Sequence, residues 1–148
     1  MIKKIRNLFT RKPLGVWTEL GFGDAVDRLS ILEIKVARLT GDTQIAVRKN
    51  FCRLRDDLIK AKCNALEAPE YSELLKVNSK LWDVEDSIRE VGTIAFSGVL
   101  GDASKKFMSL AQSVYRLNDK RSKIKSELDL RLGARHPEIK SYNQTVKE

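Results

Sequence analysis

The stretch FGDAVDRLSILEIKVARL, residues 22–39, decides the fold that the sequence predicts. Its apolar residues recur at alternating intervals of three and four, which places them on one face of an α-helix. Asp24 follows two glycines and is predicted to cap this helix, and Gly41 is predicted to stop it. The residues of the apolar stripe are Phe22, Ala25, Leu29, Leu32, Val36 and Leu39.

Three further segments repeat this pattern. The second opens at Asp42 and its stripe runs to Ala65; the third opens at Pro69, a residue that suits a first helical turn. The fourth opens at Asp102 and ends near Gly133. Four matches predict an all-α protein whose four main helices form a bundle or coiled-coil-like helical hairpins. The three stripes are Val47, Phe51, Leu54, Leu58, Ala61 and Ala65; Leu74, Val77, Leu81, Val84, Ile88 and Val91; and Phe107, Leu110, Val114, Leu117, Ile124 and Leu128.

Two of these helices carry a second apolar face. Ile31 and Ile34 lie off the stripe of the first helix, and Leu75 and Trp82 lie off the stripe of the third. Such faces must be covered by another helix of the same chain or by a partner subunit. Of these two arrangements we favour the second, in which two copies of the chain form a homodimer.

The composition sets the class of protein. The chain has 148 residues, with 28 Lys+Arg, 20 Asp+Glu and a formal net charge of +8. This length fits one domain with a sizeable core. The balance of 42% apolar and 32% charged residues excludes collagen-like, mucin-like and grossly disordered chains. No run approaches 18 apolar residues, so the sequence predicts no membrane span.

Basic charge is concentrated at the two ends of the chain. We divide the chain into a basic amphipathic N-terminal segment (1–15), a helical domain (16–133) and a C-terminal tail (134–148). The N-terminal segment either packs its apolar residues on the bundle or docks on a protein partner or an anionic membrane surface. We therefore expect a cytoplasmic protein, peripheral to the membrane where this segment docks. The docking residues would be Lys3, Lys4, Arg6, Arg11 and Lys12.

Cysteine and histidine give no sign of a metal or redox centre. Cys52 and Cys63 fall in one predicted helix, where 11 residues at about 1.5 Å each separate them by roughly 16 Å, beyond disulfide reach. They are expected to be small hydrophobic residues in a reducing compartment. His136 is the only histidine, and it has no cluster of carboxylates beside it for a zinc site. We expect no metal and no cofactor.

The net charge raises the question of nucleic-acid binding. The basic residues of the second helix are interrupted by Asp56 and Asp57, whereas a helix that reads a groove concentrates its basic residues on one face. No stacking platform or zinc-finger spacing occurs in the sequence. Solvated helix faces therefore explain these residues better than nucleic acid does: Arg48, Lys49, Arg53, Arg55, Lys60 and Lys62.

Arg121 interrupts the apolar stripe of the fourth helix. A guanidinium on a helix seam is costly unless it is paired or reaches water. One interpretation is a structural ion pair with a carboxylate on a facing helix: Glu33, Asp83 or Glu85. The other is an anion-binding cleft lined by Arg121 with Arg116 and Lys125, where Asn118 adds hydrogen bonds.

Three stretches together resemble a family of small proteins that share a domain of unknown function. They are DRLSILEIK (residues 27–35), LWDVEDSIR (81–89) and SVYRLNDKR (113–121), with the third continuing to Lys140, Ser141 and Tyr142. They are similar to the family patterns D-K/R-L-T/S-I-L-E-I-K, L-W-x-x-E-D-x-I-R and S-V-Y-R-x-N-D-x-R. The resemblance implies a setting among genes for cell-surface polysaccharide and glycosyl transfer. It does not point to a particular activity.

Polar residues of these motifs come from three predicted helices and form the candidate site. They either fix helix register as a buried network or bind a phosphate- or carboxylate-bearing ligand such as a nucleotide sugar. The function expected first is a non-catalytic helical interaction or anion-binding module. The alternatives are a small cofactor-free helical enzyme acting on a polyanionic metabolite and a nucleic-acid-binding or regulatory factor. The candidate residues are Asp27, Glu33, Lys35, Trp82, Glu85, Arg116, Asn118, Arg121 and Lys125.

Overall fold

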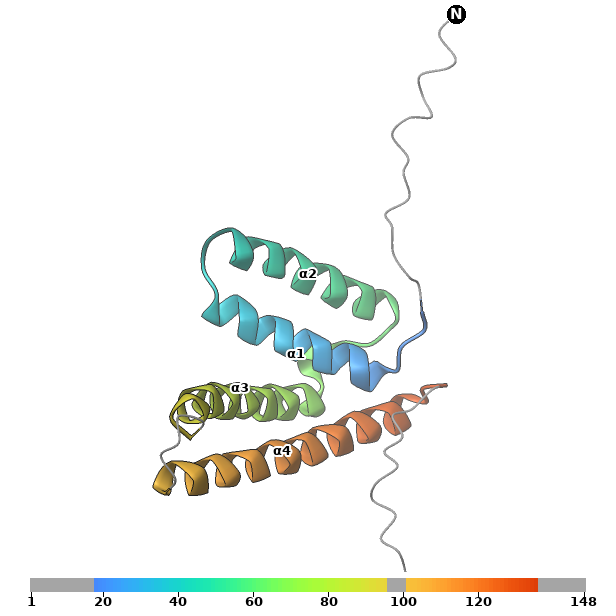
Figure 1. Cartoon of the computed structure of the whole chain (residues 1–148). Helices are drawn as coiled ribbons and strands as arrows, with labels where there is room; N and C mark the ends of the chain where they lie inside the picture. The colour runs from blue at the N-terminus through green and yellow to red at the C-terminus, as the bar shows by residue number, and fades with distance from the viewer. Residues whose placement is uncertain (1–17, 96–100, 136–148) are drawn as a thin grey trace, which may run out of the picture.

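The computed structural model describes residues 18–95 and 101–135, and the regular structure in these ranges is entirely helical (Figure 1). Helix α1 spans Phe22–Arg38, α2 spans Gly41–Lys60, and a single 3-10 turn, η1, spans Ala65–Glu67. Helix α3 spans Pro69–Ala95 and α4 spans Asp102–Leu132. The predicted all-α bundle is confirmed, and α2, α3 and α4 each begin at or next to the residue where the sequence predicts their start.

The start of α1 differs in detail from the prediction. Gly21 is the N-cap, and Asp24 lies in the first turn. A carboxylate is favourable there because it faces the positive end of the helix dipole. Gly41, expected only to stop the first helix, is the first residue of α2 and has a φ of 63°. Glycine reaches this left-handed conformation without the strain that a side chain imposes.

The end of α2 also differs from the prediction, which continued the helix to Ala65. The helix ends at Lys60, and Lys62 has a φ of 60°. The Cys63 N–H donates to the Leu58 carbonyl at 2.9 Å, closing a turn typical of a helix C-terminus. Glycine usually occupies the left-handed position in this turn. Because Lys62 occupies it here, the sequence does not show that the helix ends at this point.

Helix α1 lies in the middle of the molecule (Figure 1). The α2 helix runs beside it on one side, and α3 and α4 pair with each other on the other side. The core therefore forms where α1 meets the α3–α4 pair, with α2 and η1 closing one side of it. The buried hydrophobic residues of this core are Ala25, Val26, Leu29, Leu58, Cys63, Ala65, Tyr71, Leu74, Val77, Leu81, Ile124 and Leu128.

The second apolar faces found in the sequence are covered to different extents within the chain. Ile34 is only 5% exposed. Ile31, Leu75 and Trp82 are half-buried. Helices of the same chain therefore cover Ile34, while Ile31, Leu75 and Trp82 keep part of their surface exposed.

A glycine allows α1 to approach α4 closely at one end. A Cβ atom placed on Gly23 would lie 2.4 Å from the main-chain oxygen of Lys125, nearer than real Cβ contacts come. The Gly23 N–H donates to the Oδ1 atom of Asp129 at 2.7 Å, and Asp129 is only 1% exposed. This contact holds the first turn of α1 against α4 and so sets the position of the α1 residues that follow.

None of the helices in the described ranges combines the length and the apolarity that crossing a membrane requires.

Candidate functional site

A buried carboxylate holds Arg121 at the junction of α1 and α4. Arg121 donates from Nε to Asp27 Oδ1 at 2.7 Å and from Nη2 to Asp27 Oδ2 at 2.5 Å. Asp27 is 4% exposed, and the Arg121 side chain is 28% exposed. Two parallel bonds from a guanidinium to a carboxylate fix orientation as well as charge. The seam arginine thus forms a structural ion pair, and Asp27 is a partner that the sequence did not assign to it.

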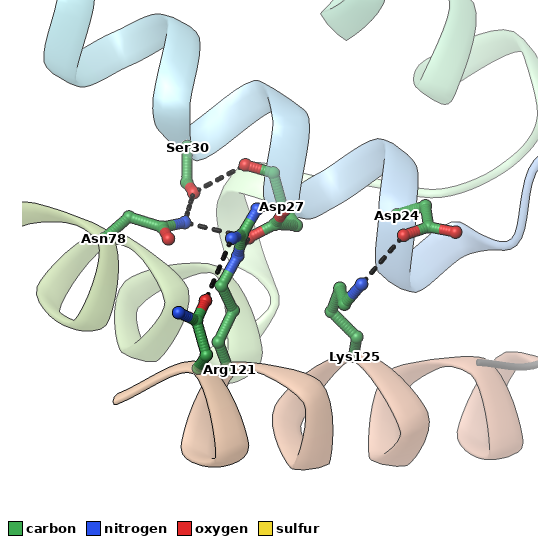
Figure 2. Close-up of polar contacts among 7 residues, drawn as sticks. Asp24, Asp27, Ser30, Asn78, Arg121 and Lys125 are labelled. Atoms are coloured by element: carbon green, nitrogen blue, oxygen red, sulfur yellow. Dashed lines mark hydrogen bonds and ion pairs between the residues drawn. The ribbon is translucent and has the colours of Figure 1, made fainter. Parts of the chain in front are cut away.

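Two polar residues complete the network around this ion pair (Figure 2). Asn78 on α3 donates from Nδ2 to Asp27 Oδ1 at 2.9 Å and to Ser30 Oγ at 2.8 Å. The Ser30 hydroxyl in turn donates to the main-chain oxygen of Asp27 at 2.8 Å. Asn78 is 5% exposed and Ser30 is fully buried. The network therefore links three helices and satisfies its buried polar groups, as a register-fixing network requires.

Sequence reasoning missed Asn78 and Ser30. Asn78 directly follows Val77, a stripe residue of α3, and Ser30 directly follows Leu29, a stripe residue of α1. The signal was therefore a small polar residue next to the seam on two facing helices. It is a weak signal, because such residues are also common on solvated faces.

A second ion pair lies along α1 toward its N-terminus (Figure 2). The Lys125 ammonium donates to Asp24 Oδ1 at 2.9 Å, and the Lys125 side chain is 12% exposed. Its charge is thus used to tie α4 to the first turn of α1. Lys125, predicted to line an anion cleft, does not line the pocket that lies between α1, α3 and α4.

A pocket of about 240 Å³ opens beside the Asp27–Arg121 network, between α1, α3 and α4. Five of the predicted site residues line it together: Lys35, Trp82, Glu85, Asn118 and Arg121. The remaining lining residues are Ile31, Ile34, Asn78 and Leu81. The pocket thus has an apolar floor and polar groups from all three helices, the usual make-up of a small-ligand site.

Lys35 is the cation of this pocket without a counter-charge. Within residues 18–95 and 101–135, the half-buried Lys35 has no ion-pair or hydrogen-bond partner. Arg121, the other cation in the lining, is held by the Asp27 carboxylate. A half-buried ammonium that lacks a partner is a ready donor to an anion that enters the pocket.

Glu85 and Trp82 form the α3 side of the pocket. The Glu85 carboxylate accepts a bond from Arg89 at 3.4 Å, and its side chain is 52% exposed. The guanidinium of Arg38 lies over the Trp82 ring, 5.4 Å from its centroid, and it pairs with Asp83 at 2.8 Å. Arg38 therefore holds the indole by a cation–π contact at the edge of the pocket.

Two further predicted site residues, Glu33 and Arg116, lie away from the pocket. Glu33 accepts a hydrogen bond from the hydroxyl of Tyr71, where burial, aided by this carboxylate, raises the pKa of the phenol above its usual value. Arg116 lines a separate surface hollow between α3 and α4, with Lys80 and Leu117 among its neighbours. The nine residues predicted to share one cleft are therefore divided: five line the pocket, three (Asp27, Glu33 and Lys125) are ion-paired or hydrogen-bonded outside its lining, and Arg116 lines a separate hollow.

The described ranges contain no group of His, Cys, Asp and Glu side chains arranged to hold a metal ion. Cys52 and Cys63 are both free thiols. Cys63 lies beyond the end of α2 rather than on the same helix as Cys52, and burial raises the pKa of its thiol. Two predicted elements lie outside the described residues: His136 and the five basic docking residues Lys3, Lys4, Arg6, Arg11 and Lys12.

Compared with family models, with curated proteins and with solved structures, the chain matches none.

Proposed function

We propose that this chain is a small, non-catalytic helical module that binds the phosphate or carboxylate group of a small ligand in the α1–α3–α4 pocket. The observation that carries the proposal is the half-buried Lys35 ammonium, which has no partner among the described residues and faces a pocket. Its neighbour Arg121 is held in place by Asp27, so the pocket is formed before a ligand arrives. A preformed site loses less free energy to ordering when it binds.

The size and lining of the pocket limit the ligand class. About 240 Å³ is below the roughly 300–1,000 Å³ of typical drug-sized sites, so it suits a small metabolite or one anionic end of a larger one. The Asn118 amide and the Lys35 ammonium supply directed donors for anion oxygens. Trp82 supplies an apolar wall for the body of the ligand.

The family resemblance gives this binding activity a setting. The three motifs include every one of the five predicted residues that line the pocket, on residues 27–35, 81–89 and 113–121. We place the module as an accessory to cell-surface polysaccharide biosynthesis, in the cytoplasm and peripheral to the membrane where the N-terminal segment docks. A sugar phosphate or nucleotide sugar carries the anionic group that the pocket would take.

One observation favours an enzyme as the second candidate. The Glu85 carboxylate lines the same pocket as the two cations Lys35 and Arg121, an arrangement that a cofactor-free helical enzyme would need for electrostatic catalysis. However, Arg121 is bound to Asp27, and Glu85 is shared with Arg89 and over half exposed. These contacts leave one cation for a substrate, so binding without turnover is the better-supported function.

Nucleic-acid binding receives less support from α2. Arg55 pairs with Asp56 at 2.9 Å, and Lys60 pairs with Asp57 at 3.2 Å. The first of these carboxylates also raises the pKa of Arg55. These two ion pairs interrupt the basic surface of α2, whereas binding of a duplex requires a continuous basic face.

The test is binding of inorganic phosphate, followed by a panel of sugar phosphates, to the full chain at constant ionic strength. A ligand at about ten times its Kd should add about 1.4 kcal/mol of stability, which is roughly 3–5 °C in Tm for a chain of this size. Lys35→Met should abolish this rise. Lys76→Met is the matched control, because Lys76 is an exposed lysine of α3 outside the pocket.

Three outcomes separate the hypotheses. A phosphate response that depends on Lys35 and not on Lys76 supports the anion site. A flat response across the panel, or one that Lys35→Met leaves intact, contradicts it. Turnover of a panel ligand that Glu85→Gln abolishes, with binding retained, would favour the enzyme instead.

A further inference from the structure

One side of α4 is exposed and does not take part in the core. Met108 and Tyr115, two of its large hydrophobic side chains, are 58% and 55% exposed. With Lys105, Gln112 and Asp119 they recur at intervals of three, four, three and four. Such spacing places all five residues on one side of the helix and is typical of a seam between two helices. We call these five residues the α4 stripe.

The α4 stripe lies on a different side of α4 from the residues that pack in the bundle. Val114 and Leu117 pack against the hydrophobic core, and neither belongs to the stripe. The polar contacts that tie α1 to α4 run from Arg121 to Asp129. The stripe ends at Asp119, so it lies on the half of α4 that precedes these contacts.

The chemistry of the stripe is self-complementary when it is turned end for end. Lys105 stands at one end and Asp119 at the other, Met108 and Tyr115 lie inside them, and Gln112 is at the centre. A two-fold axis through Gln112 sets Lys105 of each copy opposite Asp119 of the other. Met108 and Tyr115 stand four and three residues from Gln112, so each Met108 lies within one residue step of the Tyr115 of the other copy. An isologous contact of this kind needs one surface that complements itself.

We propose that two copies of this chain associate through the α4 stripe, with their α4 helices antiparallel. The charge pattern favours a second copy of this chain as the partner. When the second stripe runs antiparallel to the first, the cation at one end of each stripe meets the anion of the other. The two Gln112 amides meet on the axis, where a polar residue in an apolar seam specifies register. Asp119 is half-buried and keeps its interaction within the chain, since a carboxylate accepts several bonds at once.

The size of the contact predicts a weak dimer. The stripe covers 15 residues of α4, from 105 to 119, or about 21 Å at 1.5 Å per residue. One helix pair of this length buries less than the roughly 1,600 Å² of a standard stable interface. We therefore expect a Kd on the order of 10–100 µM.

Sedimentation velocity of the full chain from about 5 µM to about 500 µM brackets that affinity. The sedimentation coefficient should rise from the monomer value toward the dimer value across this range. Tyr115→Glu should keep the chain monomeric throughout. Leu130→Glu is the matched control, because Leu130 is a 72% exposed hydrophobic residue of the same helix outside the stripe. Circular dichroism melts check that each variant is folded.

Charge exchange tests the antiparallel arrangement. Lys105→Glu alone and Asp119→Lys alone each place like charges at both ends of the dimer, so each should weaken association at least tenfold. An equimolar mixture of the two variants pairs opposite charges at both ends and should recover a heterodimer. Gln112→Cys should form a disulfide-linked dimer under mild oxidation faster than the parent chain, because the two Gln112 positions meet on the axis.

The proposal is overturned by a parent chain that stays monomeric at the highest concentration. It is equally overturned by a dimer that is insensitive to Tyr115→Glu and to the mixing of charge variants, since that result would place the interface elsewhere. Binding of phosphate at Lys35 is measured on the monomer, so failure of the dimer leaves the anion site untouched and the reverse also holds.

Discussion

The two halves of α1 use charged residues in different ways. In the first half, Asp24 and Asp27 each meet a cation from α4, and the Gly23 N–H meets a carboxylate there. In the second half, Glu33 and Arg38 also have partners on α3, but Lys35 lines a pocket and its side chain has no partner among the described residues. One helix thus carries paired charges and, at Lys35, a charge that is not paired within the described ranges.

This difference separates structural charges from charges that await a ligand. A buried charge that has a partner fixes how helices pack, and removing the partner is costly. A half-buried charge that lacks a partner contributes little to packing, so its position in the protein requires an explanation other than packing. Substitutions in α1 should therefore have opposite effects: loss of a paired charge in the first half should lower stability, and loss of Lys35 should abolish binding.

Asp27→Ala should have the largest effect on stability. The substitution leaves the Arg121 guanidinium without its carboxylate and removes an acceptor of Asn78, in a position that is 4% exposed. Loss of one partner of a buried pair costs about 3–5 kcal/mol, and the partial exposure of Arg121 favours the lower end. Urea unfolding followed by circular dichroism measures this loss.

A double substitution sharpens the Asp27 result. Asp27→Leu combined with Arg121→Met removes both charges and leaves apolar groups of similar volume, so it should cost less than Asp27→Ala alone. A double variant that is less stable than Asp27→Ala would contradict the ion pair as the source of the loss. It would point to the Asn78 and Ser30 contacts instead.

Much of this fold could be predicted from the sequence because its signals are periodic and local. The spacing of Phe22, Ala25 and Leu29 is sufficient to define a helix, since it needs no knowledge of the rest of the chain. Pro69 and Gly133 mark helix ends through their own backbone chemistry. The end of α2 at Lys60 could not be predicted in this way, because Lys62, and not a glycine, takes the left-handed position after it.

The site was harder to predict because its contacts join distant parts of the chain. Arg121 stood out as a charge on a seam, but its carboxylate lies 94 residues away, and periodicity contains no information on pairing. Lys35 and Lys125 are both predicted from the sequence to belong to the candidate site, yet one lines the pocket and the other pairs with Asp24. Only the packing of α1 against α4 distinguishes them.

Lys125→Met and Lys35→Met compare the two halves of α1 directly. Lys125 is 12% exposed and paired, so its loss should cost about 1 kcal/mol by leaving Asp24 without its cation. Lys35→Met should change stability by less than about 0.5 kcal/mol, because the Lys35 side chain has no hydrogen bond or ion pair among the described residues to lose. Chemical unfolding of both variants without ligand measures the difference. An equal loss from both would remove the distinction between Lys125 and Lys35.

Acid titration of Glu70 gives the smallest expected effect and extends the comparison to a paired carboxylate outside α1. Arg131 donates to both Glu70 oxygens, at 2.7 and 2.8 Å, and this hydrogen bonding lowers the pKa of Glu70 below its usual value. A carboxyl whose folded pKa is lowered stabilises the protein fully above its unfolded pKa, and the contribution disappears as the pH falls through the folded pKa. Glu70→Gln should therefore melt below the parent chain at pH 7, and the gap should close as the pH falls below about 4.5. A gap that is unchanged at low pH would show that the Arg131 contact does not depend on the charge of Glu70.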